Sequence, residues 1–126
     1  MDSVTETYQA FKGLHGNRLL EMRDLIFAAA DATNTAPLTE TLKWGQPAYL
    51  PAKRAGTTVR LGADAEHPAM FVHCQTDLVS RYRVLFPTEF TYSGNRAVRL
   101  PASGPYSAAA FQQIAAMALT YHRDKR

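Results

Sequence analysis

The sequence predicts an α+β domain in which an antiparallel sheet of about four to five strands is flanked by helices. Apolar residues recur at helical spacing towards both ends of the chain, whereas the middle alternates apolar and polar residues with a period of two. Short links containing glycine or proline join the predicted strands, which favours antiparallel pairing. We therefore expect N-terminal helices, a central sheet and one long C-terminal helix.

Length and composition favour one globular domain over residues 1–126. The hydrophobic fraction of 46% and the charged fraction of 20% argue against a disordered chain. No apolar run approaches the roughly 20 residues that a membrane helix needs, so we expect no membrane association. Cys74 is the single cysteine, which excludes an internal disulfide. We expect a cytoplasmic protein.

The helices are predicted from capping signals and apolar stripes. Residues 3–6 fit a capping box, and Gly13 is expected to end the short helix that follows. A longer helix is expected from about residue 17 to 33, and a short one from Pro37 to Gly45. Pro87 should stop a further helix, and the last one should run from Ala108 to about His122. The long N-terminal helix should bury one stripe, formed by Leu19, Met22, Ile26, Ala29 and Ala30.

The strands are predicted from alternation. Residues 48–50 lie between two prolines, so a strand there is expected to be short and at a sheet edge. Residues 57–61 and 69–74 should form a hairpin with 62–68 as its loop, and residues 90–92 and 96–100 a second hairpin. The side chains expected to face the core are Val59, Leu61, Met70, Val72, Cys74, Val98 and Leu100.

The same alternation turns a second set of side chains to the opposite face, and this set is the first candidate site. It consists of Arg60, Phe71, His73 and Arg99. Two guanidinium groups, an imidazole and an aromatic ring would suit an anionic or aromatic ligand. The alternative is a solvated or helix-covered face on which the arginines pair with local carboxylates.

The segment from Lys43 to Pro47 is the second candidate. In one interpretation Gly45 ends a helix and Trp44 packs at the junction. In the other, Trp44 and Tyr49 form an aromatic wall of a binding site with Lys43 at its rim.

Other chemistries receive less support. Six of the ten arginines fall between Arg54 and Arg99 and could bind phosphates. The net charge of +3 is nevertheless modest for a nucleic-acid-binding protein. His73 and Cys74 are adjacent on a predicted strand and should point to opposite faces, which disfavours a base and nucleophile pair. The four histidines lack the spacing of metal ligands. We therefore assign no catalytic residue, no metal ligand and no cofactor.

Several motifs together resemble the bacterial YdhG-like family, a domain of unknown function. The motifs that carry the resemblance are Leu42-Lys43-Trp44-Gly45-Gln46-Pro47-Ala48-Tyr49, Thr58-Val59-Arg60-Leu61-Gly62, Val72-His73-Cys74-Gln75-Thr76-Asp77-Leu78, Phe90-Thr91-Tyr92-Ser93-Gly94-Asn95-Arg96-Ala97 and Ala118-Leu119-Thr120-Tyr121-His122. The resemblance implies a compact α+β domain whose sheet is flanked by helices, and it brings no catalytic residue with it. One distant branch of the family is described as a frataxin-like iron chaperone, a role expected to need an acidic surface.

From the sequence we expect a monomer or homodimer that binds a small anionic ligand or a protein partner through the Arg60, His73 and Arg99 face. A frataxin-like iron chaperone or other metal-handling protein is the alternative, and binding of single-stranded nucleic acid is the third. An enzyme would have His73 as its acid–base candidate.

Overall fold

A six-stranded antiparallel sheet and four α-helices make up the fold in the computed structural model, which describes residues 3–11 and 14–125. The helices are α1 (Ser3–Ala10), α2 (Leu14–Thr33), α3 (Leu78–Leu85) and α4 (Ala108–Leu119). The strands are β1 (Thr39–Lys43), β2 (Gln46–Leu50), β3 (Val59–Asp64), β4 (His67–Phe71), β5 (Thr91–Ser93) and β6 (Ala97–Arg99). Two short 3-10 turns, Ala52–Arg54 and Arg123–Lys125, complete the described elements. The predicted α+β class is confirmed, with one strand more than expected.

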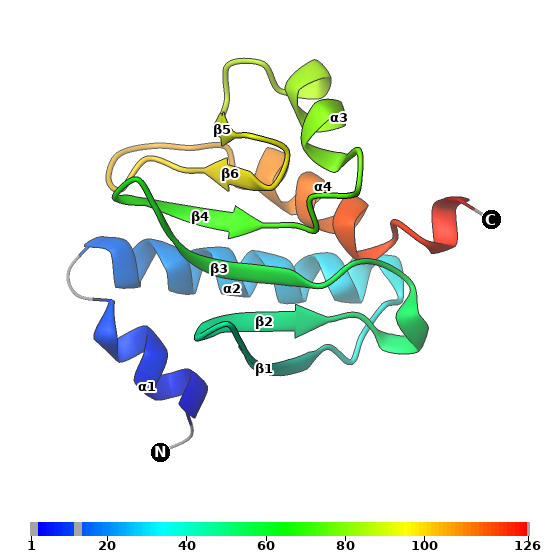
Figure 1. Ribbon diagram of the computed structural model, residues 1–126, viewed down its shortest axis with the longest axis horizontal. Coiled ribbons are helices and arrows are strands. Elements are labelled where there is room, and N and C mark those ends of the chain that lie inside the picture. The colour runs from blue at the N-terminus through cyan, green and yellow to red at the C-terminus, as the bar shows by residue number, and fades with distance from the viewer. Residues whose placement is uncertain (1–2, 12–13, 126) are drawn as a thin grey trace.

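The strand order is β1-β2-β3-β4-β6-β5, and every neighbouring pair is antiparallel. Figure 1 shows α2 running along the far side of the sheet, behind β3. Helix α4 packs against α2 and α3, and α1 contacts α2, β1 and β2. The fold therefore has two layers, with helices on one face of the sheet.

The two longest hairpins turn through only two residues each. Trp44 and Gly45 link β1 to β2 with φ angles of 56° and 74°, and Ala65 and Glu66 link β3 to β4 with φ angles of 50° and 66°. Positive φ at both central positions matches the twist of the flanking strands, which is why such turns are favoured in hairpins. The prediction of a loop over residues 62–68 is therefore wrong, because β3 runs to Asp64 and β4 begins at His67.

The short helix predicted between Pro37 and Gly45 is also wrong, because most of this segment is strand β1. Gly45 is the second residue of a hairpin turn rather than a helix end. Strand β1 pairs with β2 over five residue pairs and forms the edge of the sheet. Strand β2 consequently lies inside the sheet, although Pro47 suggested an edge position. A proline near the start of a strand removes little of its hydrogen bonding.

The helix predictions elsewhere are confirmed, with shifted ends. Helix α2 begins at Leu14, three residues earlier than expected, whereas Gly13 lies outside the described residues. Helix α4 ends at Leu119, and the Ser107 side chain caps its start by accepting a hydrogen bond of 3.1 Å from the Ala110 backbone N–H. Such a cap satisfies one of the free donors at a helix start.

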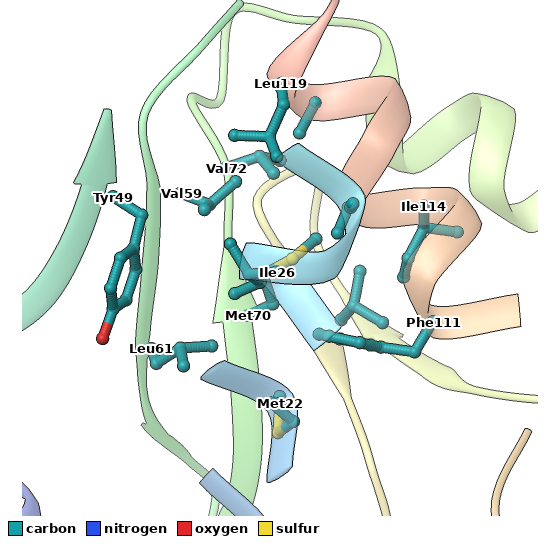
Figure 2. Packing of buried hydrophobic residues seen from close by; sticks show 14 of the residues in the cluster. Met22, Ile26, Tyr49, Val59, Leu61, Met70, Val72, Phe111, Ile114 and Leu119 are labelled. Carbon is teal, nitrogen blue, oxygen red and sulfur yellow. The ribbon is translucent and has the colours of Figure 1, made fainter. Parts of the chain in front are cut away.

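The hydrophobic core lies between the sheet and the helices. Figure 2 shows Ile26 of α2 between strand residues such as Met70 and the α4 residues Phe111 and Ile114. All five residues of the predicted α2 stripe are fully buried. Of the strand residues expected in the core, six are buried, namely Val59, Leu61, Met70, Val72, Val98 and Leu100.

Cys74 is exposed, so its predicted core position is wrong. Strand β4 ends at Phe71, and the chain then turns, with the Thr76 backbone N–H donating to the His73 carbonyl oxygen at 3.1 Å. The alternation that would have placed Cys74 inside stops where the strand stops.

A candidate ligand-binding face on the sheet

The second face of the sheet, which we call the bare face, carries no helix in the part of the chain that Figure 1 draws in colour. The strand register places its side chains in two rows. One row consists of Thr41, Ala48, Arg60, Phe71, Ala97 and Ser93. The other consists of Lys43, Gln46, Gly62, Ala69, Arg99 and Thr91.

Small residues form the floor of this face and long polar side chains cover them. Ala48, Ala69 and Ala97 are fully buried although Figure 1 shows no helix of the described residues on this side of the sheet. The Gln46 side chain lies directly over Gly62, because a Cβ atom built on Gly62 would come 2.5 Å from Gln46 Nε2. A floor of small residues lets side chains from neighbouring strands lie flat across the sheet.

Two arginines share one aromatic ring at the centre of the bare face. The guanidinium carbon of Arg60 lies 5.6 Å from the centre of the Phe71 ring, and that of Arg96 lies 5.5 Å from it. The ring itself is only 3% exposed. Arg60 also donates from Nη1 to Gln46 Oε1 at 2.8 Å. We call Gln46, Arg60, Phe71 and Arg96 the Arg60–Arg96 cluster.

Positive charge in this cluster is not neutralised locally. Within residues 3–11 and 14–125, neither Arg60 nor Arg96 forms an ion pair with a carboxylate. The pKa of Arg60 is lowered, first because partial burial removes water from the guanidinium and second because the Arg96 charge repels it. Nearby carboxylates would have the opposite effect. An oxyanion placed between the two guanidiniums would relieve this repulsion.

Arg99 lies on the same face, as predicted, but its charge is compensated. Its Nε atom lies 2.6 Å from Asp64 Oδ2, and both side chains are mostly buried. The same face thus contains one paired arginine and one unpaired cluster. At Arg99 the alternative interpretation is correct, because this arginine is paired with a local carboxylate, that of Asp64.

His73 was expected on the same face as Arg60, but it is not part of a strand. It lies beyond the end of β4, is exposed, and its Nδ1 atom accepts a 3.1 Å hydrogen bond from the Gln75 backbone N–H. Its imidazole is therefore used in a local turn.

The expected aromatic wall of Trp44 and Tyr49 is not formed. Trp44 is 89% exposed at the tip of the β1–β2 hairpin, so it does not pack a junction either. Tyr49 is fully buried on the helix side of the sheet, where its ring meets Phe27 edge-on at 5.6 Å between centres. Lys43 is exposed and lies opposite Gln46 on the bare face.

Arg96 and Gln46 are the members of the cluster that are absent from the expected set. Arg96 lies in the strand expected over residues 96–100, where alternation with Val98 and Leu100 would turn it towards the core; the structure instead places it in the turn before β6. Gln46 lies next to the Trp44-Gly45 turn that was interpreted as a helix end.

The architecture and this face define a two-layer α+β domain with one helix-covered sheet face and one bare face. No family model and no curated protein matches the sequence. Among solved structures, the fold matches a crystal structure of YdhG from Bacillus subtilis, a protein of the DUF1801 family, with a TM-score of 0.66. The match covers 98% of this chain and 94% of that chain at 16% sequence identity. This likeness confirms the expected YdhG-like fold.

Two further findings concern alternatives raised by the sequence. Among the described residues, no helix is long and apolar enough to cross a membrane. In the same part of the chain, no three His, Cys, Asp or Glu side chains lie close enough together to hold a metal ion.

Proposed function

We propose that this protein is a binding protein whose ligand is a small oxyanion, a phosphate or a carboxylate, held by Arg60 and Arg96 on the bare face. The observation that carries the proposal is the pair of guanidiniums over Phe71 without a carboxylate partner among the described residues. Arginine suits such ligands because its planar donors match the geometry of two oxygen atoms.

The surroundings of the pair support a preorganised site. The Gln46 side chain accepts a hydrogen bond of 2.8 Å from Arg60, and the guanidinium carbons of Arg60 and Arg96 lie 5.6 Å and 5.5 Å from the centre of the Phe71 ring. Less conformational entropy is lost on binding when a side chain is already held in place. We therefore place Gln46 and Phe71 as positioning residues and the two arginines as the groups that contact the ligand.

Isothermal titration with inorganic phosphate, pyrophosphate and citrate at low ionic strength tests the proposal. Arg60→Gln and Arg96→Gln should each weaken binding by about tenfold or more, because a hydrogen bond to a charged group contributes roughly 1.5–3 kcal/mol. The matched control is Arg81→Gln, which changes the net charge equally at an exposed site on α3. Stronger binding of pyrophosphate than of citrate would identify the phosphate class, and the reverse the carboxylate class.

Two results would contradict the proposal. One is the absence of saturable binding for all three anions. The other is an equal loss in all three variants, which would mean that net charge rather than this face attracts the anion.

A further inference from the structure

A second concave site lies on the helix side of the molecule, away from the bare face. It is a pocket of about 610 Å³ between α1, α2 and β1. This volume falls within the range of roughly 300–1,000 Å³ that is usual for small-molecule sites. Sequence motifs do not indicate it, because its walls come from segments that only the fold brings together.

The inner end of the pocket is polar but electrically compensated. Arg23 donates from Nε to Glu40 Oε2 at 2.6 Å and from Nη2 to Glu40 Oε1 at 3.1 Å. The Arg23 guanidinium also covers the Phe27 ring, at 4.8 Å from its centre. The charges of Arg23 and Glu40 are therefore already paired with each other. A charged ligand would have to separate this pair, which would leave one of the two charges without its partner.

Tyr8 adds a neutral hydroxyl at the same end. Its side chain is buried, and its oxygen lies 2.5 Å from the Tyr49 hydroxyl. Burial raises the pKa of Tyr8 to about 12, so the phenol is uncharged at neutral pH. Among the described residues that line it, the pocket thus offers hydrogen-bonding groups without an unpaired charge.

The outer walls are mixed. The apolar side chains that line the pocket are Val4 and Phe11, which are half-buried, and Leu20, which is 43% exposed. The carboxamides of Gln9 and Asn17 line the same pocket from exposed positions. A lining of apolar side chains and neutral amide groups favours a ligand that has both an apolar part and an uncharged polar part.

We infer that this pocket is a binding site for a small uncharged molecule with an apolar ring at one end and an amide or hydroxyl group at the other. The ring lies against Val4, Phe11 and Leu20, and the polar group faces the carboxamides of Gln9 and Asn17. This site is separate from the oxyanion site, and neither proposal depends on the other.

Titration with benzamide, followed by NMR amide shifts, tests the inference, with benzoate and benzylammonium as charged probes of nearly the same shape. Benzamide should shift the Tyr8, Asn17 and Leu20 amides saturably, with a dissociation constant on the order of 1 mM or lower. Benzoate and benzylammonium should bind about tenfold more weakly or not at all, because each brings an uncompensated charge.

Variants decide whether the shifts come from this pocket. Leu20→Trp places a larger side chain in the pocket and should weaken benzamide binding by about tenfold or more. Leu85→Trp, at a similarly exposed leucine on α3, should leave it unchanged. Asn17→Ala, which does not fill the pocket, should weaken binding by a smaller factor.

Three results would overturn the inference. They are the absence of saturable shifts up to about 10 mM benzamide, equal binding by wild type and Leu20→Trp, and equal binding of the neutral and charged probes. Arg60→Gln should not change benzamide binding, so failure here is distinguishable from failure of the oxyanion proposal.

Discussion

Arg60 and Arg99 show how much the environment of a residue decides its role. Both lie on the bare face, and both were expected there from strand alternation. Arg99 is held by Asp64 at 2.6 Å, whereas Arg60 faces Arg96 and a neutral amide. Only an arginine without a carboxylate partner keeps its full attraction for an incoming anion.

The first residue-scale prediction concerns Tyr8 at alkaline pH. Its pKa rises from 10.0 to about 12 on folding because burial disfavours the phenolate. Between pH 10 and pH 12 the Tyr8 hydroxyl is deprotonated in the unfolded chain but still protonated in the folded protein. The contribution of Tyr8 to the free energy of unfolding is therefore complete below pH 10 and is lost as pH rises towards 12. In Tyr8→Phe this loss is absent.

Urea unfolding across that pH range provides the measurement. The free energy of unfolding should fall less steeply with pH in Tyr8→Phe than in wild type. A residual fall is expected in the variant, because burial also raises the pKa of Tyr49 and of Tyr82. Identical slopes in the two proteins would contradict the prediction.

The second residue-scale prediction compares two glycines. A Cβ atom on Gly56 would lie 2.2 Å from the Ala118 carbonyl oxygen and 2.3 Å from the Leu119 carbonyl carbon, which are backbone atoms near the end of α4. A Cβ atom on Gly62 would meet only the flexible end of the Gln46 side chain. Gly56→Ala should therefore cost about 2–4 kcal/mol and Gly62→Ala about 1 kcal/mol or less.

Urea denaturation of both variants and wild type measures these costs. Equal destabilisation by the two substitutions would mean that the backbone around Gly56 moves aside as easily as a side chain does.

At the scale of elements, the β1–β2 hairpin shows where local patterns mislead. Pro37 and Gly45 match the start and end signals of a short helix. The same glycine equally suits the second position of a two-residue hairpin turn. Pairing of β1 with β2 along their whole length decides between the two. Such pairing joins residues as far apart as Thr39 and Leu50, which the start and end signals of the short helix do not contain.

Trp44 provides the element-scale prediction. It adopts a φ of 56° at the first position of the turn and is 89% exposed. A bulky side chain in the left-handed region costs roughly 1–2 kcal/mol per residue, and asparagine followed by glycine is the preferred pair for this turn. Trp44→Asn should therefore stabilise the protein by about 0.5–1 kcal/mol.

The shift in the urea midpoint at constant slope measures this gain. Gly45→Ala should show the opposite sign, because it introduces a side chain at a φ of 74°. A loss of stability in Trp44→Asn would show that the exposed indole makes contacts that support the hairpin.

At the scale of the whole molecule, the two layers separate two surfaces with different chemistry. Helices cover one sheet face and form the core and the pocket beside α1. No helix of the described residues covers the other face, which carries a small cluster of Ala69, Phe71 and Ala97. Substitutions at the two sites should act independently, because the described contacts of the Arg60–Arg96 cluster and the described lining of the pocket involve different residues.

Ile114 tests the contribution of the shared core. It is fully buried in the cluster that joins α4 to the sheet and α2. Ile114→Ala should reduce the free energy of unfolding by about 2–5 kcal/mol, from lost burial and the cavity left behind. The matched control Val84→Ala removes apolar atoms at a site that is 81% exposed and should change stability by less than about 0.5 kcal/mol.

Thermal and urea unfolding of both variants, followed by near- and far-UV circular dichroism, checks this prediction. Coincident transitions by the two signals are expected for a cooperative core. A small effect of Ile114→Ala, comparable to that of Val84→Ala, would mean that the α4 contact contributes little.

The sequence by itself determined the α+β class, the buried stripe of α2 and the inward faces of β3, β4 and β6. These features follow from periodicity, which each segment carries locally. Only the tertiary structure decided that β1 is a strand, that Arg96 joins Arg60 over Phe71, and that Asp64 occupies Arg99. The physical reason is that each of these depends on which strands become neighbours and where each strand ends, and the periodicity of a single segment contains neither.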